Sequence, residues 1–204
     1  MDKADHPDQV RLRAYLDDTE ELLAASKIDG SWVLRLDVGL PQDLDLLDKR
    51  DLDNFAYPLA TRLKKNPGLV SVWCTKQHDA QSFVRIDAPR ELPPPSTGML
   101  VVSTPSAKMP EYKERIYAAV ADLAELPAGR PVRLELAFVI GPNGRNWLEL
   151  WKPTIDSLSP LLGRSPLSGQ WDPCDGRIVE LAMHLTVDPA LRYEVTVGIA
   201  AKAL

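Results

Sequence analysis

The chain has 204 residues, enough for one large domain or for two domains of about 100 residues each with adequate cores. With 45% hydrophobic and 26% charged residues, its composition is that of a folded globular protein and excludes intrinsic disorder. No apolar run approaches the roughly 18 residues of a membrane span, and the polar start Met1–His6 does not fit a secretory signal, so we expect a cytoplasmic protein. The formal net charge of −5 contrasts with the basic face of most nucleic-acid-binding proteins. Cys74 and Cys174 lack Cys-x-x-Cys spacing, which argues against structural zinc.

The first half of the chain predicts a helix, a strand, a second helix and two short strands. Leu12, Leu16 and Leu23 share one face of the first helix, and Asn66-Pro67-Gly68 is expected to end the second. Alternating apolar and polar residues predict the strands. The expected elements are a helix at residues 7–25, a strand at 32–38, a helix from Asn54 to about residue 65, and strands at 70–74 and 82–86.

The second half repeats this order after a proline-dense stretch at residues 88–96, which can continue neither a helix nor a central strand. A turn is expected at Asn143-Gly144. The expected elements are a strand at residues 99–103, a helix at 111–126, a strand at 132–140, a helix at 147–162, and strands at 177–185 and 193–200. The sequence therefore predicts a mixed α/β (α+β) fold with partly antiparallel sheets. Since no Gly-x-Gly-x-x-Gly or P-loop follows a predicted strand, a doubly wound nucleotide-binding fold is not expected.

Residues 12–86 and 112–181 look like one unit written twice. Residues of like character recur at a spacing of 100 and then, past a longer loop in the first copy, of 95. Such a unit is far longer than a solenoid repeat, so two similar lobes side by side are the better interpretation. The prediction is a lobe at residues 7–88, a proline-rich connector at 89–110 and a second lobe at 111–201. The matched pairs are Leu16 with Ile116, Leu34 with Leu134, Leu36 with Leu136, Leu52 with Trp147, Phe55 with Leu150, Pro58 with Pro153, Phe83 with Ile178, Val84 with Val179, and Ile86 with Leu181.

An acidic string, Asp51-Leu52-Asp53-Asn54, occurs only in the first copy. In an extended segment Asp51 and Asp53 would point together at one cation while Leu52 packs behind them. Mg²⁺ in proteins is held by carboxylates, waters and substrate phosphates, so a third acid would complete a site, and Asp79, before the strand at 82–86, is the candidate. Asn54 is expected to cap the following helix. The alternative is that these acids only cap a helix or face solvent, since the loop also contains Asp43-Leu44-Asp45.

The order helix, strand, Asp-x-Asp-Asn, helix, then acid and strand resembles the RusA-type Holliday-junction resolvases, small Mg²⁺-dependent homodimeric endonucleases of DNA recombination and repair. In that family a lysine follows the second aspartate by four residues and a third catalytic aspartate precedes the next strand. In the first unit Asp51, Asp53 and Asp79 match the three acids, but Tyr57 takes the place of the lysine.

In the second unit Lys152 matches the lysine and Asp175 the third acid, while Asn146 and Leu148 replace the acid pair. The resemblance thus implies a tandem duplicated, partly degenerate relative: two RusA-like lobes, each helix-strand-helix-strand, packed as a pseudo-dimer. It implies Asp51, Asp53, Asp79, Lys152 and Asp175 as catalytic residues, with Mg²⁺ or Mn²⁺ held by the first three.

The implied function is metal-assisted nicking of branched or structured DNA, with no membrane partner. The acting species is either a pseudo-dimeric monomer or a further association of such chains. A chain with one complete acid set would place at most one nick per binding event. Two other classes stay open: an inactive RusA-like module that binds nucleic acid or a protein, and an unrelated enzyme or interaction protein whose acids are structural. Trp147 and Trp151 could stack bases, but packing in the core is the favoured interpretation.

Overall fold

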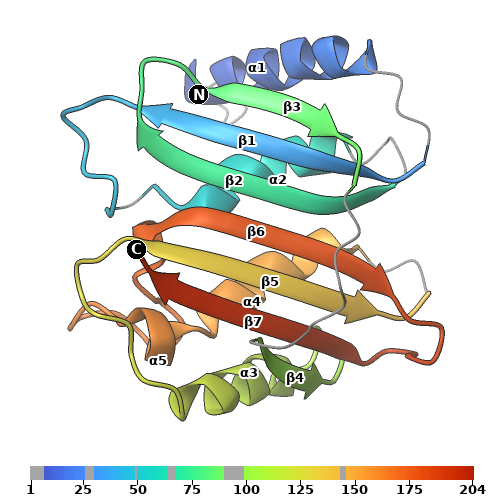
Figure 1. Cartoon of the computed structure of the whole chain (residues 1–204), viewed down its shortest axis with the longest axis vertical. Helices are drawn as coiled ribbons and strands as arrows, with labels where there is room; N and C mark the ends of the chain where they lie inside the picture. Colours follow the sequence, from blue (N-terminus) through green and yellow to red (C-terminus); the bar gives the residue numbers. More distant parts are fainter. Residues whose placement is uncertain (1–6, 26–29, 49, 64–67, 90–98, 143–145) are drawn as a thin grey trace.

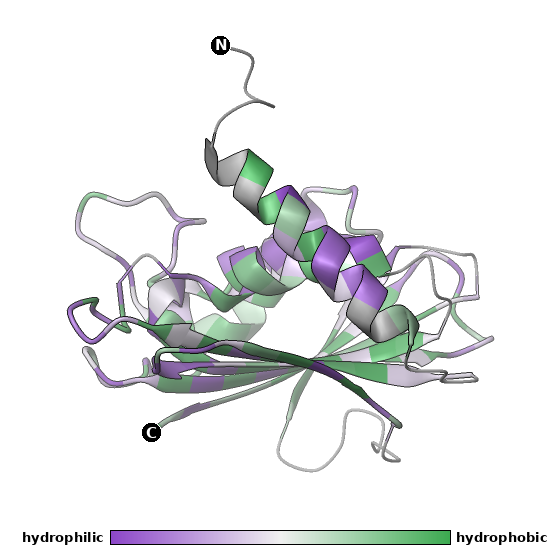
Figure 2. Ribbon diagram, turned by 90° about the horizontal axis from the view of Figure 1, so that it is seen from above, coloured by the Kyte–Doolittle hydropathy of each residue, from purple (hydrophilic) through white to green (hydrophobic). Residues whose placement is uncertain are grey.

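The strands of the computed structural model form one mixed sheet of seven strands, in the order β3-β1-β2-β6-β5-β7-β4 (Figure 1). The helices lie together on one face of this sheet (Figure 2). The structure describes residues 7–25, 30–48, 50–63, 68–89, 99–142 and 146–204. The expected mixed α/β class is confirmed. The elements are α1 Pro7–Ala24, β1 Trp32–Leu40, α2 Leu52–Leu63, β2 Leu69–His78, β3 Phe83–Asp87, β4 Leu100–Thr104, α3 Glu111–Ala121, β5 Val132–Ile140, the 3-10 helix η2 Trp147–Leu150, α4 Trp151–Asp156, α5 Ser159–Leu162, the 3-10 helix η3 Asp175–Arg177, β6 Ile178–Val187 and β7 Val195–Ala203.

Side-chain alternation along the strands builds the core. In β1, Leu34 and Leu36 are buried on the helical face, whereas Arg35 and Asp37 are half-buried on the open face. The buried apolar side chains form one continuous cluster that extends from β1 in the first half to β7 in the second. Trp151 is completely buried in this cluster, and Trp147 is 6% exposed, so the preferred interpretation of these tryptophans as core residues is confirmed.

The helix expected at residues 147–162 is divided into η2, α4 and α5. Pro160 lies in the first turn of α5, where a proline causes no loss of a helical hydrogen bond, so a new helix begins there. The helix expected at 111–126 ends at Ala121, and the N–H of Leu126, beyond its end, donates to the carbonyl of Leu161. The expected turn at Asn143-Gly144 and most of the proline-rich stretch lie outside the described residues.

The two halves of the sheet use the same pairing pattern. β1 is parallel to β2 and antiparallel to β3, and β5 is parallel to β6 and antiparallel to β7. Even the irregularities match: the β1–β2 register shifts between Trp32 and Val33, and the β5–β6 register shifts between Val132 and Arg133, 100 residues later. The halves meet where β2 pairs with β6 in the antiparallel sense.

The end of the sequence alignment between the halves was wrong. It matched Phe83, Val84 and Ile86 with β6, but the strand that occupies the position of β6 in the first half is β2. Leu69 of β2 and Ile178 of β6 hold the same register position, 109 residues apart, and β3 corresponds to β7. The spacing between the halves is thus 95 residues at the starts of α2 and η2 but 109 residues at β2 and β6. The second half therefore contains 14 more residues than the first between that helix start and the strand that follows.

No helix within the described ranges is both long enough and apolar enough to cross a membrane.

Candidate metal centre

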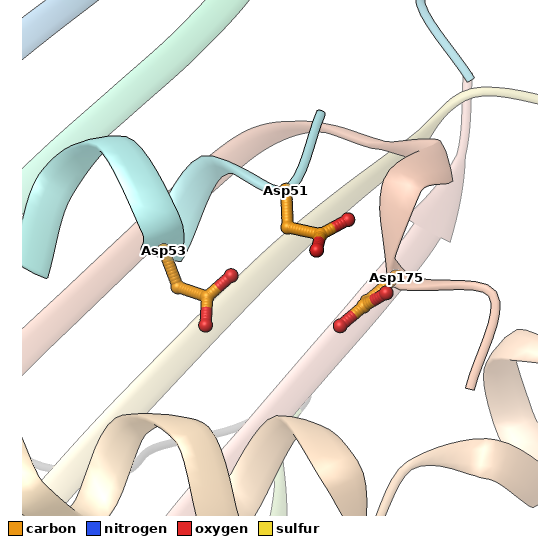
Figure 3. A group of neighbouring side chains, drawn as sticks. All are labelled: Asp51, Asp53 and Asp175. Atoms are coloured by element: carbon orange, nitrogen blue, oxygen red, sulfur yellow. The ribbon is translucent and has the colours of Figure 1, made fainter. Parts of the chain in front are cut away.

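The acid pair lies at the start of α2, where β1 has ended and the chain turns back over the sheet. Asp51 immediately precedes the helix, Leu52 is its first residue, and Asp53 lies in its first turn. The expected extended segment is therefore wrong, although Leu52 does pack inward, at 1% exposed. Both carboxylates nevertheless point to the same side in Figure 3, because the bend into the helix brings them together.

Asn54 does not cap α2 as expected. It lies inside the first turn, and its side-chain amide donates a 2.9 Å hydrogen bond to Asp51 Oδ2, while its backbone N–H donates to the Asp51 carbonyl. Asn54 therefore orients the Asp51 carboxylate.

The third carboxylate comes from the other half of the molecule. Asp175, the first residue of η3, directs its side chain toward Asp51 and Asp53 (Figure 3). One oxygen atom of each of the three carboxylates lies within 4.8 Å of the others. The predicted residues Asp51, Asp53 and Asp175 are thus brought together from segments more than 120 positions apart in the sequence.

Asp79 is not in this cluster, and the prediction that it is the third metal ligand is corrected here. It forms the turn after β2: its backbone N–H donates to the Leu40 carbonyl, and its Oδ1 accepts from the Gln81 backbone N–H at 3.1 Å. Asp188 makes the same two bonds at the corresponding place in the second half, to Ile140 and Ala190. A side chain that bonds the backbone two residues later forms an Asx turn, so the role of Asp79 is to shape the turn.

Lys152, on α4, lies beside the cluster. Its ammonium group is 3.2 Å from Asp175 Oδ2 and 3.1 Å from Asp156 Oδ1. Burial alone would lower the pKa of Lys152, but the charges of Asp175, Asp156 and Asp53 outweigh that effect and raise it. Lys152 is therefore a permanent cation at the edge of the acid cluster.

The pKa values of two of the acids are shifted upward. Burial, reinforced by the nearby charge of Asp51, raises the pKa of Asp175 to about 6 although Lys152 opposes the shift. The pKa of Asp53, whose side chain is buried, is raised mainly by burial and also by Asp51, again against the attraction of Lys152. Like charges gathered in a partly buried place disfavour full ionisation, and a bound cation would remove that penalty.

The sequence analysis missed a second lysine at this site. Lys76, near the end of β2, is 4% exposed, and its ammonium group donates to the carbonyl of Arg50 at 2.7 Å and to the carbonyl of Gly176. Burial lowers the pKa of Lys76 to about 8, although Asp51, Asp175 and Asp45 act to raise it. A signal was available: Lys76 follows Val72 and Cys74 at the two-residue spacing of a core-facing strand row.

Arg177 was also missed. It is 5% exposed, and its guanidinium donates to the backbone carbonyls of Leu126, Pro127, Arg130 and Leu162. These bonds fix η3, and with it Asp175, to the loop between α3 and β5 and to the end of α5. An arginine two residues after a candidate ligand carried no recognisable motif, so only the structure could reveal this role.

A pocket of about 300 Å³ opens beside the carboxylates. Asp51 and Asp175 line one part of it, and the loop between α5 and η3 supplies Ser165 and Ser168. The pocket places room for a polar ligand next to the acids.

The donor set fits a hard divalent cation. Three carboxylates supply only oxygen ligands, which suits Mg²⁺ or Mn²⁺, and a pocket at their side leaves space for waters or a substrate phosphate. The exposed thiol of Cys174 lines the same pocket but is not a member of the ligand cluster.

Neither a protein-family model nor a curated protein sequence matches the chain.

Proposed function

We propose that this protein is a metal-dependent endonuclease that nicks branched or structured DNA, with one active centre assembled from both halves of the chain. The observation that carries the proposal is the convergence of Asp51 and Asp53 from the first half with Asp175 and Lys152 from the second. These are four of the five residues that the RusA-type pattern implies, although the pattern distributes them over two separate units.

We further propose that the halves are two RusA-like lobes packed as a pseudo-dimer. At the β2–β6 junction Ser71 pairs with His184, Trp73 with Ala182 and Thr75 with Glu180. When the 109-residue correspondence between β2 and β6 is applied, Trp73 maps onto Ala182, and each flanking pair maps onto the other. This is the register expected for a twofold axis that passes between Trp73 and Ala182, as in an isologous dimer interface.

The losses in the two lobes are complementary, which supports this proposal. The first lobe keeps the acid pair but has Tyr57 in place of the lysine, and the second keeps Lys152 but has Asn146 and Leu148 in place of the acids. If each centre draws its acid pair from one lobe and its lysine and third acid from the other, these losses leave one centre intact and abolish the other.

The hydrogen bonds at the start of the corresponding helix in the second half support the proposed loss of a second acid pair. The N–H of Glu149 donates to the Asn146 carbonyl, as that of Asn54 does to Asp51, and the Asn146 amide donates to Glu149 Oε1. In the first half the acid is Asp51 and the amide is Asn54, three residues later; in the second half the amide, Asn146, comes first and the acid, Glu149, follows. The hydrogen bond between amide and acid is the same, but the negative charge is no longer at the position of the ligand Asp51.

The protein's own groups have clear parts in the chemistry. Asp51, Asp53 and Asp175 would hold the cation, Asn54 orients Asp51, and Lys152 orients Asp175 and balances its charge. A cation held there would supply the Lewis acid that stabilises charge on a phosphodiester during in-line attack by water. The pocket beside Asp51 and Asp175 provides room for the phosphate.

The test compares single variants at ligand and non-ligand acids. Binding of Mn²⁺ or Mg²⁺ to the folded state should raise the melting temperature of the wild type. At a metal concentration of a hundred times the Kd, the free energy of unfolding should increase by about 2.7 kcal/mol. Asp51→Asn, Asp53→Asn and Asp175→Asn should each lose this response and the metal-dependent nicking of a branched DNA.

Asp79→Asn is the matched control, because asparagine preserves the Asx turn while removing the same charge. It should respond to the metal as the wild type does. An equal loss in Asp79→Asn would contradict the assigned ligand set, and a wild type that binds Mn²⁺ and branched DNA without nicking it would identify an inactive binding module.

A further inference from the structure

Lys76 lies between the two segments that carry the proposed ligands. It is on β2, the strand of the first half that borders the second, and its side chain is buried on the helical face together with Cys74. Its ammonium group reaches the carbonyl of Arg50 on one side and that of Gly176 on the other. Arg50 directly precedes Asp51, and Gly176 directly follows Asp175.

We propose that Lys76 is a positioning residue of the centre: it holds the Asp51 segment and the Asp175 segment at the spacing that a shared cation requires. The inference deepens the proposed function and rests on it for the identity of the ligand. In the described part of the chain, the ammonium group of Lys76 bonds backbone carbonyls and not the carboxylates, so it acts through the backbone of their neighbours.

A lysine is chemically suited to this task. A single ammonium group has three N–H donors and no acceptor, so one nitrogen can bond two carbonyls that converge from different segments. A hydrocarbon side chain at the same place would leave both carbonyls without that donor, and a buried carbonyl such as that of Gly176 destabilises the folded state when it has no hydrogen-bond partner. The positive charge also lies near Asp51, Asp175 and Asp45, whose repulsion would otherwise separate the segments.

The equivalent position in the other half supports the assignment. Leu185 holds the register position of Lys76 on β6, 109 residues later. The lobe that lacks the acid pair at its own helix start therefore carries a leucine, where the first lobe carries a lysine.

The experiment measures the two segments and the cation separately. Lys76→Met keeps the length of the side chain but removes the donors, and Lys76→Arg restores them. In EDTA, amide hydrogen exchange at residues 41–51 and 172–177 should be at least tenfold faster in Lys76→Met than in the wild type, because both segments lose their common anchor. The Mn²⁺ Kd, measured by electron paramagnetic resonance of the free ion, should rise at least tenfold and return toward the wild-type value in Lys76→Arg.

Leu185→Ala is the control for a general loss of stability, since it shortens a strand side chain at the equivalent position. It should leave the Mn²⁺ Kd and the exchange of both segments unchanged. If Lys76→Met does not unfold cooperatively, Lys76→Gln takes its place. The planar glutamine amide keeps N–H donors but cannot direct them at both carbonyls, so the same direction of change is expected.

Unchanged exchange in both segments, or an unchanged Mn²⁺ Kd in a folded Lys76→Met protein, would overturn the role of Lys76. A wild type that binds no Mn²⁺ would overturn the cation centre itself. In that case faster exchange in Lys76→Met would still show that Lys76 tethers the two segments, so the two failures are distinguishable.

Discussion

At the scale of single residues, the centre places charge where packing alone would favour an apolar group. Asp53 is 5% exposed, and its counterpart at the start of the second-half helix is Leu148, which is 1% exposed. The pKa of Asp53 is raised by burial and by Asp51, so its ionised form is disfavoured in the folded protein relative to the unfolded chain. Sites that bind ligands commonly reduce stability in this way.

Removing that charge should therefore stabilise the metal-free protein. Because the pKa is raised in the folded state, the penalty is absent below the unfolded pKa of about 4 and grows as the pH rises through the folded pKa. In EDTA at pH 7, we expect Asp53→Asn to gain about 1 kcal/mol, or roughly 2–4 °C in melting temperature, and to lose this advantage near pH 4.

Thermal unfolding at both pH values checks this expectation. The control is Asp79→Asn, which removes a carboxylate from the turn after β2 and should melt as the wild type does. A lower melting temperature for Asp53→Asn at pH 7 would show that Lys152 stabilises the ionised carboxylate more than burial destabilises it.

At the scale of helices and strands, the close contact between β1 and the turn after β2 requires a glycine at position 39. A Cβ added to Gly39, in β1, would lie 2.1 Å from the carbonyl oxygen of Gln81, in the turn that Asp79 shapes. We expect Gly39→Ala to destabilise the protein by about 1–3 kcal/mol, because backbone has to move to accommodate the methyl group. Urea unfolding measures the difference.

Gly169→Ala is the matched control, since no atom of the described residues beyond its two chain neighbours lies within 4 Å of a Cβ built at Gly169. It should change the free energy of unfolding by less than about 0.5 kcal/mol. Equal stability of the two variants would mean that the turn after β2 is not packed against β1.

The strands were largely predictable from sequence, because alternation and burial are properties of neighbouring residues. The strand expected at 132–140 has those bounds in the structure. The strand expected at 70–74 is longer, Leu69–His78, because Thr75, Lys76 and Gln77 look like a polar loop, whereas β1 continues to pair with them. Their pairing in the sheet depends on partners far along the chain, which sequence spacing does not reveal.

The site was half predictable for the same reason. The acid pair forms a local motif, so Asp51 and Asp53 were found together. Asp79 is the expected third acid because it precedes the strand expected at 82–86 in the same unit. The structure instead brings in Asp175, since β2 and β6 are antiparallel neighbours and η3 precedes β6 at the end of the sheet where α2 begins.

At the scale of the whole molecule, the proposed function predicts a single cut. A supercoiled plasmid that extrudes a cruciform should be converted in its first encounter to a nicked circle, because only one centre retains its acids. Linear plasmid would need two cuts and should appear only after rebinding, at a rate that depends on protein concentration. Gel electrophoresis under single-turnover conditions distinguishes the two products, and direct formation of linear DNA would contradict the proposal of one centre.

The junction of β2 and β6 has a further consequence for how such a protein meets its substrate. In the proposed pseudo-dimer, a half-turn about the Trp73–Ala182 pair exchanges the strands of the two halves, which share one pairing pattern, but it does not exchange the side chains of the metal centre. A four-armed DNA that is itself symmetric could dock equally well in either of two orientations. In each orientation a different strand would lie over the carboxylates, so strand choice would be random on symmetric junctions and biased only by asymmetry in the DNA.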